Sequence, residues 1–156
     1  MIKYDYYISP IGEIFLEYEN EELISLTYSL KEKRIFEETS FSQMVKKQLE
    51  EYFNLKRRDF TIPLREYGSE LERETLKIVK DIEYGSTMTY QDIAEKLGNK
   101  YLSRFVGRTN HFNKFPIIIP CHRVIGKNKT LIGYNGGLDK KIYLLRLEGV
   151  EVNGYK

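Results

Sequence analysis

Hydrophobic and polar positions alternate along the first thirty residues, in short runs separated by turn-forming residues. The alternation covers residues 3–8, 13–18 and 23–28, and the turn Ser9-Pro10-Ile11-Gly12 separates the first two runs. A period of two is typical of strands that bury one face. The pattern therefore predicts a three-stranded β-meander at the N-terminus.

The spacing becomes helical after residue 42. Val45, Leu49, Tyr52 and Phe53 recur every three or four positions, which predicts a helix over residues 42–53. A short extended stretch ending at Pro63 should follow. We place a domain boundary near Arg65, so that residues 1–65 form an N-terminal β-sheet and helix domain with a structural role.

Two helix starts are visible beyond this boundary. Ser69 with Glu72 forms a capping box for a helix that should stop at Tyr84-Gly85, and Thr89 with Asp92 marks a second start. In both cases the side chain of the first residue can accept a hydrogen bond from a backbone N–H that the helix leaves unpaired.

The second helix should end at Gly98-Asn99, with a third over residues 102–112 and a last one from about Asp139 to Glu148. Two short helices joined by a tight glycine-containing turn are typical of a helix-turn-helix, although a simple helical hairpin has the same pattern. The expected fold class is α+β with two small domains, in which residues 66–156 form a mostly helical, winged-helix-like domain.

Residues 115–120 are apolar and bracketed by prolines, which predicts a buried extended segment that delivers Cys121 into the core. Cys121 is the only cysteine, so the chain has no internal disulfide. One cysteine and two histidines are too few soft ligands for a zinc site. We therefore expect no metal or cofactor.

The net charge of +2 conceals an uneven distribution. Residues 96–129 contain eight basic and no acidic residues, which leaves 17 basic against 23 acidic residues elsewhere. A basic segment suits a polyanion such as DNA, although a solvated basic face would look the same. No apolar run is long enough for a membrane span and the N-terminus has no signal peptide, so we expect a cytoplasmic protein, or a nuclear one in a eukaryote.

The neighbours of Cys121 favour a reactive thiol. A free thiol titrates near pH ~8.5, and His122 and Arg123 are groups that can favour the thiolate. On an extended segment His122 would point away from Cys121, so a bridging water would have to carry the proton. Glu148 is a candidate to orient the histidine.

The string Ile119-Pro120-Cys121-His122-Arg123-Val124-Ile125-Gly126 resembles the active-site signature of the O6-alkylguanine-DNA alkyltransferases. Further landmarks of that family follow in order and spacing over about residues 71–149. They are Tyr84-Gly85, Thr89-Tyr90, Ile93-Ala94, Ser103-Arg104-Phe105-Val106-Gly107, Asn113, Gly133-Tyr134-Asn135-Gly136-Gly137 and Leu144-Leu145-Arg146-Leu147-Glu148-Gly149.

The resemblance implies a role for each matching residue. Cys121 would accept the alkyl group, His122 would act as the base through water, and Glu148 would orient His122. Tyr90 would donate to guanine N3, and Asn113 would tie the helix-turn-helix to the active-site segment. Tyr134, Asn135, Gly136 and Gly137 would form a wall of the base pocket. The residues expected to contact DNA are Tyr90, Lys100, Ser103, Arg104, Arg108 and Arg123, with Arg104 filling the gap left by the flipped nucleotide.

The implied function is direct-reversal DNA repair by a monomer acting on duplex DNA. Residues 66–156 would be the DNA-binding and alkyl-transfer domain. The alkyl group of O6-alkylguanine, with O4-methylthymine as a second candidate lesion, would be transferred irreversibly to Cys121. The damaged nucleotide would have to leave the stack to reach a buried thiol. Taken singly, the tyrosines, Arg104, Asn113 and Glu148 also suit purely structural roles, and His111 matches no role and is assigned to structure or surface.

Three other functions fit parts of the pattern. A module that recognises alkylated DNA and recruits repair factors would have another residue, commonly tryptophan, at the acceptor position, and this chain has no tryptophan. A thiol hydrolase or protease would leave the basic segment without a purpose. A helix-turn-helix regulator would leave Cys121 unexplained.

Overall fold

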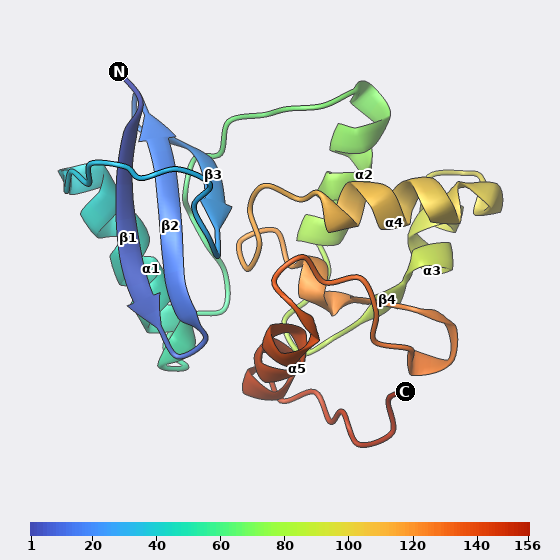
Figure 1. The fold of residues 1–156 in the computed structure, drawn as a ribbon. Coiled ribbons are helices and arrows are strands. Elements are labelled where there is room, and N and C mark those ends of the chain that lie inside the picture. The colour runs from blue at the N-terminus through green and yellow to red at the C-terminus, as the bar shows by residue number, and fades with distance from the viewer. The chain divides into compact units, whose positions relative to one another are not determined.

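The computed structural model describes all residues, 1–156. The chain forms two compact units, Met1–Glu66 and Tyr67–Lys156, each with its own helices and strands (Figure 1). The boundary expected near Arg65 lies next to this division. The α+β class with two small units, strands first and helices after, is confirmed.

The first unit is an antiparallel meander of β1 (Lys3–Ser9), β2 (Gly12–Glu19) and β3 (Glu22–Thr27), in the order β1-β2-β3. Ile14, Leu16 and Tyr18 of β2 are buried, as a period of two requires when one face meets the core. α1 (Ser40–Phe53) runs along one face of the sheet (Figure 1) and buries Val45, Leu49, Tyr52 and Phe53.

Two details of this unit differ from the sequence pattern. The helix begins two residues earlier than predicted, because Thr39 and Ser42 form a capping box at its start. The stretch around Pro63 pairs with β3: the Leu23 N–H donates to the Pro63 carbonyl at 2.9 Å, and the Arg65 N–H donates to the Leu23 carbonyl at 2.8 Å. It therefore extends the edge of the sheet.

The second unit begins with α2 (Glu70–Lys80), capped by Ser69 and Glu72 as predicted. α2 ends at Lys80, four residues before the predicted end at Tyr84, and buries Leu76 and Val79. The short strand β4 (Met88–Thr89) follows and pairs in parallel with β5 (Val124–Ile125).

α3 (Tyr90–Lys96) and α4 (Ser103–His111) form the helix-turn-helix. Thr89 and Asp92 form the predicted capping box of α3, and Gly98 takes a positive φ of 91° after its end. The 3₁₀ turn η1 (Lys100–Leu102) leads into α4. The turns η2 (Cys121–Arg123) and η3 (Lys127–Lys129) and the helix α5 (Leu138–Leu147) complete the unit. None of the helices is both long and apolar enough to cross a bilayer.

Residues 115–120 are buried but not extended, so that prediction is wrong. The Ile119 N–H donates to the Phe115 carbonyl at 2.8 Å, and Ile117 has a φ of 75°, so the segment is a compact turn. An extended segment in this place would need a neighbouring strand for its polar groups. The side chain of Asn113 instead accepts from the Phe115 N–H at 2.9 Å and donates to the Ile119 carbonyl at 2.8 Å, which satisfies both ends of the turn.

Candidate active site

Cys121 is the first residue of η2 and is only 3% exposed. Its N–H donates to the Ile119 carbonyl at 2.7 Å, which fixes the residue to the preceding turn. Burial raises the pKa of the Cys121 thiol to about 11, although a hydrogen bond from the Asn113 side chain and the nearby positive charge of Lys141 act in the opposite direction. The thiol is therefore protonated at neutral pH in the free protein.

Two asparagines near the end of α4 hold the backbone around this thiol. Asn113 closes the turn before Cys121, as the tie between the helix-turn-helix and the active-site segment would require. Asn110, to which the sequence pattern assigned no role, donates from Nδ2 to the Cys121 carbonyl at 3.2 Å. Both asparagines are buried. Their spacing of three residues at the end of a helix was the signal that both face the same neighbour.

His122 and Glu148 are in contact. Nε2 of His122 lies 2.8 Å from Oε2 of Glu148, and the histidine is fully buried. Nδ1 of His122 is also buried and has no hydrogen-bond partner. Burial lowers the pKa of His122, while Glu148 opposes that shift. The imidazole is therefore neutral at neutral pH.

Glu148 also binds Arg123, and this contact bears on the prediction that Arg123 contacts DNA. Arg123 donates from Nε to Oε1 at 2.8 Å and from Nη2 to Oε2 at 2.9 Å, and its Nη1 donates to the Ile82 carbonyl at 2.6 Å. Burial alone would raise the pKa of Glu148, but the bonds from His122 and Arg123 bring it down to about 2. Arg123 is only 5% exposed. The prediction that Arg123 contacts DNA is wrong, because its guanidinium is already occupied inside the protein.

The ionised Glu148 also fixes the histidine tautomer. A carboxylate only accepts hydrogen bonds, so Nε2 of His122 carries the hydrogen and Nδ1 keeps its lone pair. Cys121 and His122 are adjacent in a 3₁₀ turn, where successive side chains are rotated by about 120°. The two side chains thus do not face each other directly, in spite of the compact backbone.

Lys141 is a buried cation that was likewise not among the predicted site residues. Its Nζ donates to the Val124 carbonyl at 2.7 Å and to the Ile132 carbonyl at 3.0 Å, and the side chain is 1% exposed. Burial lowers the pKa of Lys141 to about 8. Lys141 precedes Leu144, Leu145 and Glu148 by three, four and seven residues, so the helical period already placed it on the inward face of α5.

Residues 131–137, which we call the pocket-wall segment, contain the four residues expected beside the base. Tyr134 is 8% exposed and its carbonyl accepts from the Gly137 N–H at 3.1 Å. Gly136 is half-buried, Asn135 is exposed, and Gly137 takes a φ of 104° at the start of α5. The half-buried Tyr90 donates from its hydroxyl to the Ile132 carbonyl at 3.2 Å. Burial, with a smaller effect of Cys121, raises the pKa of Tyr90, so the hydroxyl stays a donor.

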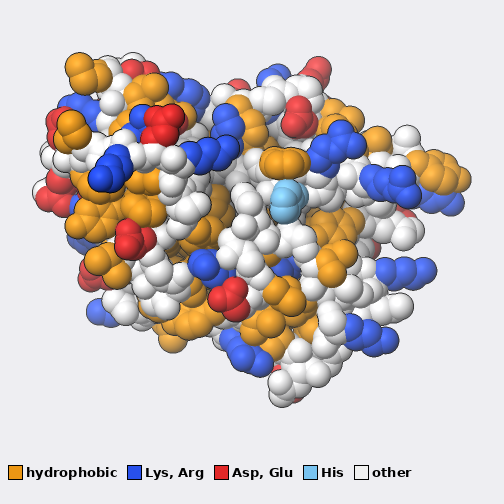
Figure 2. All heavy atoms as spheres, viewed as in Figure 1, with side chains coloured by type: hydrophobic (Ala, Val, Ile, Leu, Met, Phe, Trp, Pro, Cys, Tyr) orange, Lys and Arg blue, Asp and Glu red, His pale blue; other side chains and the backbone are white.

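The remaining residues expected to contact DNA lie in η1 and along α4. Lys100, Arg104 and Arg108 are exposed and four residues apart, and half-buried Ser103 donates to the Lys100 carbonyl at 3.2 Å. Figure 2 shows Lys and Arg side chains at several points over the side formed by α3 and α4. These cations are therefore available to solvent and to a ligand, unlike Arg123.

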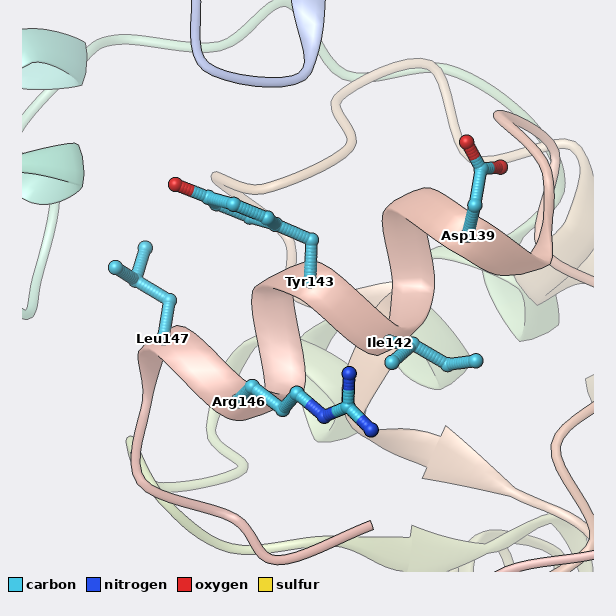
Figure 3. Close-up of a pocket in the computed structure, with 5 residues that line it drawn as sticks. All are labelled: Asp139, Ile142, Tyr143, Arg146 and Leu147. Carbon is cyan, nitrogen blue, oxygen red and sulfur yellow. The ribbon is translucent and has the colours of Figure 1, made fainter.

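A surface pocket on α5 is a separate feature. It is lined by Asp139, Ile142, Tyr143, Arg146 and Leu147, and contains none of the predicted site residues. Figure 3 shows Tyr143 and Leu147 pointing to one side of the helix and Ile142 and Arg146 to another. No group of three His, Cys, Asp or Glu side chains is placed to hold a metal ion.

Comparisons with known proteins agree with this arrangement. Residues 70–150 match the family model described as 6-O-methylguanine DNA methyltransferase, DNA binding domain, and residues 2–65 match its ribonuclease-like domain. The chain is 40% identical to a methylated-DNA--protein-cysteine methyltransferase of Methanosarcina acetivorans, over 94% of this chain and 97% of the relative. It is 34% identical to the constitutive methylated-DNA--protein-cysteine methyltransferase of Bacillus subtilis, over 91% of this chain and 92% of that relative.

Solved structures are similar over the same length. The O6-methylguanine methyltransferase of Mycobacterium tuberculosis matches with a TM-score of 0.86 and 34% identity, over 95% of this chain and 93% of that chain. A structure of the OGT of that bacterium in complex with DNA matches with a TM-score of 0.86 and 33% identity, over 94% and 93%. With both of its units matched in sequence and in structure, this chain belongs to the 6-O-methylguanine DNA methyltransferase family.

Proposed function

We propose that this protein repairs duplex DNA by moving the alkyl group of O6-alkylguanine to Sγ of Cys121. The observation that carries the proposal is a buried thiol next to a neutral histidine whose Nε2 is bound by Glu148 and whose Nδ1 has no partner. In the reaction, Sγ attacks the alkyl carbon, a C–S bond forms and the C–O6 bond breaks. The thioether has no easy route back to a thiol, so each molecule acts once.

His122 is the base for this step. The thiol pKa of about 11 keeps Cys121 protonated in the free protein, so the attack requires removal of a proton. Nδ1 of His122 has the lone pair to accept that proton, and a water between the two groups would transfer it. Glu148 stabilises the imidazolium that results, because its carboxylate already accepts from Nε2.

Tyr90 stabilises the departing guanine by donating a hydrogen bond to N3. Guanine departs with a negative charge that a hydrogen bond or proton at N3 stabilises. The Tyr90 hydroxyl has a raised pKa and so keeps its hydrogen. That hydrogen is donated to the Ile132 carbonyl in the free protein and would be donated to N3 instead when the base is bound. Asn113 keeps the turn before Cys121 in place, while Tyr134, Asn135, Gly136 and Gly137 form the wall of the base pocket.

DNA binding depends on the exposed cations of the helix-turn-helix. Lys100, Ser103, Arg104 and Arg108 contact the backbone and grooves, and Arg104 fills the space of the flipped nucleotide. The damaged nucleotide has to flip out of the duplex, because a thiol that is 3% exposed cannot reach O6 inside the stack. Unstacking the nucleotide costs a few kcal/mol. The protein acts as a monomer, with O6-methylguanine as the main lesion and O4-methylthymine as a second one.

The test is the intact mass of the protein after incubation with a duplex that contains one O6-methylguanine. We expect a gain of one methyl group per chain, at Cys121 by peptide mapping, and none with Cys121→Ala. A second incubation, with a duplex that contains O4-methylthymine, measures methyl transfer from that lesion. Tight binding to the damaged duplex without any gain in mass would contradict the proposal and support a lesion-recognition module.

A further inference from the structure

Three side chains bind two consecutive carbonyl oxygens of the pocket-wall segment. The Ile132 carbonyl accepts from the Tyr90 hydroxyl and from Nζ of Lys141. The Gly133 carbonyl lies 3.1 Å from Nδ1 of His111. The donors come from α3, α4 and α5, so the start of this segment is bound to three helices of the unit.

Of the three donors, His111 is the one that is accessible and has no proposed catalytic role. It is the last residue of α4, it is half-buried, and its ring meets that of Phe112 edge to face at 4.9 Å. A carbonyl oxygen only accepts hydrogen bonds, so Nδ1 of His111 carries the hydrogen. This single bond joins the end of the helix-turn-helix to the backbone next to Tyr134.

Burial alone does not hold this part of the segment. Ile132 and Gly133 are exposed, and Gly133 has a φ of 74°. A side chain at Gly133 would meet the Tyr90 hydroxyl at 3.4 Å, so the backbone passes close to the proposed base-binding tyrosine. Tyr134, by contrast, is buried directly after these two residues. The position of Tyr134 therefore depends on the hydrogen bonds that fix residues 132 and 133.

We propose that His111 is a positioning residue for the base pocket. By its bond to the Gly133 carbonyl it holds the pocket-wall segment in the arrangement that receives the flipped base. This inference rests on the proposed function and adds a residue to which the sequence assigned only a structural or surface role. Losing the bond weakens the capture of the base and leaves the transfer step itself unchanged.

The experiment compares His111→Leu with His111→Asn in single-turnover transfer to Cys121. Leucine has a similar volume and no donor, whereas the Asn amide can place an N–H near the position of Nδ1. Two substrates are used: a duplex with one O6-methylguanine, and the free nucleobase O6-methylguanine, which has no phosphate. Transfer is followed by intact mass over a range of substrate concentrations, and thermal melting confirms that each variant is folded.

We expect His111→Leu to raise the half-saturating concentration of both substrates by the same factor, about three- to tenfold, as suits the loss of one net hydrogen bond. The maximal transfer rate should stay within about twofold, and His111→Asn should restore most of the loss. Arg108→Leu, one turn earlier on the exposed face of α4, should weaken transfer from the duplex alone.

Three results would overturn the inference. One is an unchanged half-saturating concentration in His111→Leu. Another is a loss confined to the duplex, as for Arg108→Leu, which would make His111 a DNA contact. The third is an Asn variant as impaired as the Leu variant, which would mean that the ring acts by packing. Failure of the proposed function is distinguishable, because then the wild-type protein itself would gain no methyl group.

Discussion

Nε2 of His122 lies 2.8 Å from Oε2 of Glu148, and neither side chain reaches solvent. The two residues are 26 positions apart in the chain, on η2 and at the end of α5. Because Glu148 also accepts twice from Arg123, one carboxylate both orients the proposed base and neutralises a buried guanidinium. Changes at this carboxylate should therefore affect chemistry and stability together.

Replacing Glu148 with Gln should slow methyl transfer by roughly 10²-fold, at the lower end of what one acid or base group contributes. Glutamine keeps the shape but cannot stabilise the imidazolium of His122. The rate is measured by rapid mixing with a methylated duplex and by intact mass. Glu151→Gln, an exposed position just beyond α5, is the control and should match wild type. A Glu148→Gln rate equal to that of the control would exclude Glu148 from the transfer step.

Acid should destabilise the fold in a defined window. Burial of Glu148 is outweighed by His122 and Arg123, so its pKa is about 2 in the folded protein against 4.5 ordinarily. As the pH falls, the Glu148 carboxyl binds a proton in the unfolded chain at a higher pH than in the folded protein. The stability that ionised Glu148 contributes is therefore fully present above about pH 4.5 and is lost as the pH falls toward 2. His122, whose pKa burial lowers below 6.5, acts in the same direction at higher pH.

Urea unfolding at pH 7, 5, 4 and 3 measures this loss. The free energy of unfolding should fall by a few kcal/mol across the series, since one pKa unit corresponds to about 1.4 kcal/mol. Glu148→Gln should start less stable, because Arg123 loses its ionic partner, and should lose less below pH 4.5. Parallel curves for the two proteins would show that other carboxylates cause the acid sensitivity.

The thiol of Cys121 should react slowly with a small alkylating reagent at neutral pH. Because burial raises its pKa to about 11, only a minor fraction is thiolate, and the thiolate is the nucleophile. The rate of carboxamidomethylation by iodoacetamide should rise about tenfold per pH unit from pH 7 to 10 in the folded protein. In denaturant the rise should level off near pH ~8.5, the value for a free thiol. A plateau below pH 8 in the folded protein would contradict this assignment.

Removing the buried cation should affect both the backbone and the thiol. Lys141→Met deletes the bonds to the Val124 and Ile132 carbonyls, and a buried acceptor left without a partner costs about 1–3 kcal/mol. It also removes a positive charge that favours the Cys121 thiolate, so iodoacetamide should react more slowly at pH 7, where Lys141, with its pKa of about 8, is still charged.

Urea unfolding and the same alkylation assay measure these two effects. Lys127→Met removes the same charge from an exposed position in η3 and serves as the control. If Lys141→Met alkylates as fast as this control, the charge of Lys141 does not reach the thiol.

The sequence determined the local features of this protein. The capping boxes of Ser69 with Glu72 and of Thr89 with Asp92 involve residues three positions apart, so their chemistry is visible in the sequence. The alternation in the first thirty residues gave the meander for the same reason, because the pleat repeats every two residues. The string around Cys121 likewise named the family, since it is continuous in the chain.

Only the tertiary structure decided which polar side chains have hydrogen-bond or ionic partners inside the protein. Arg123 has the same charge as Arg104 in the sequence, but Arg123 meets Glu148 25 residues away and is buried, while Arg104 remains exposed. Residues 115–120 have the composition of a buried strand, yet no strand lies beside them and Asn113 closes them into a turn. The partners of Asn110, His111 and Lys141 are backbone carbonyls, which every residue possesses and no sequence pattern distinguishes. A backbone acceptor becomes specific only when the fold brings it within about 3 Å of a donor and excludes the water that would otherwise compete for it.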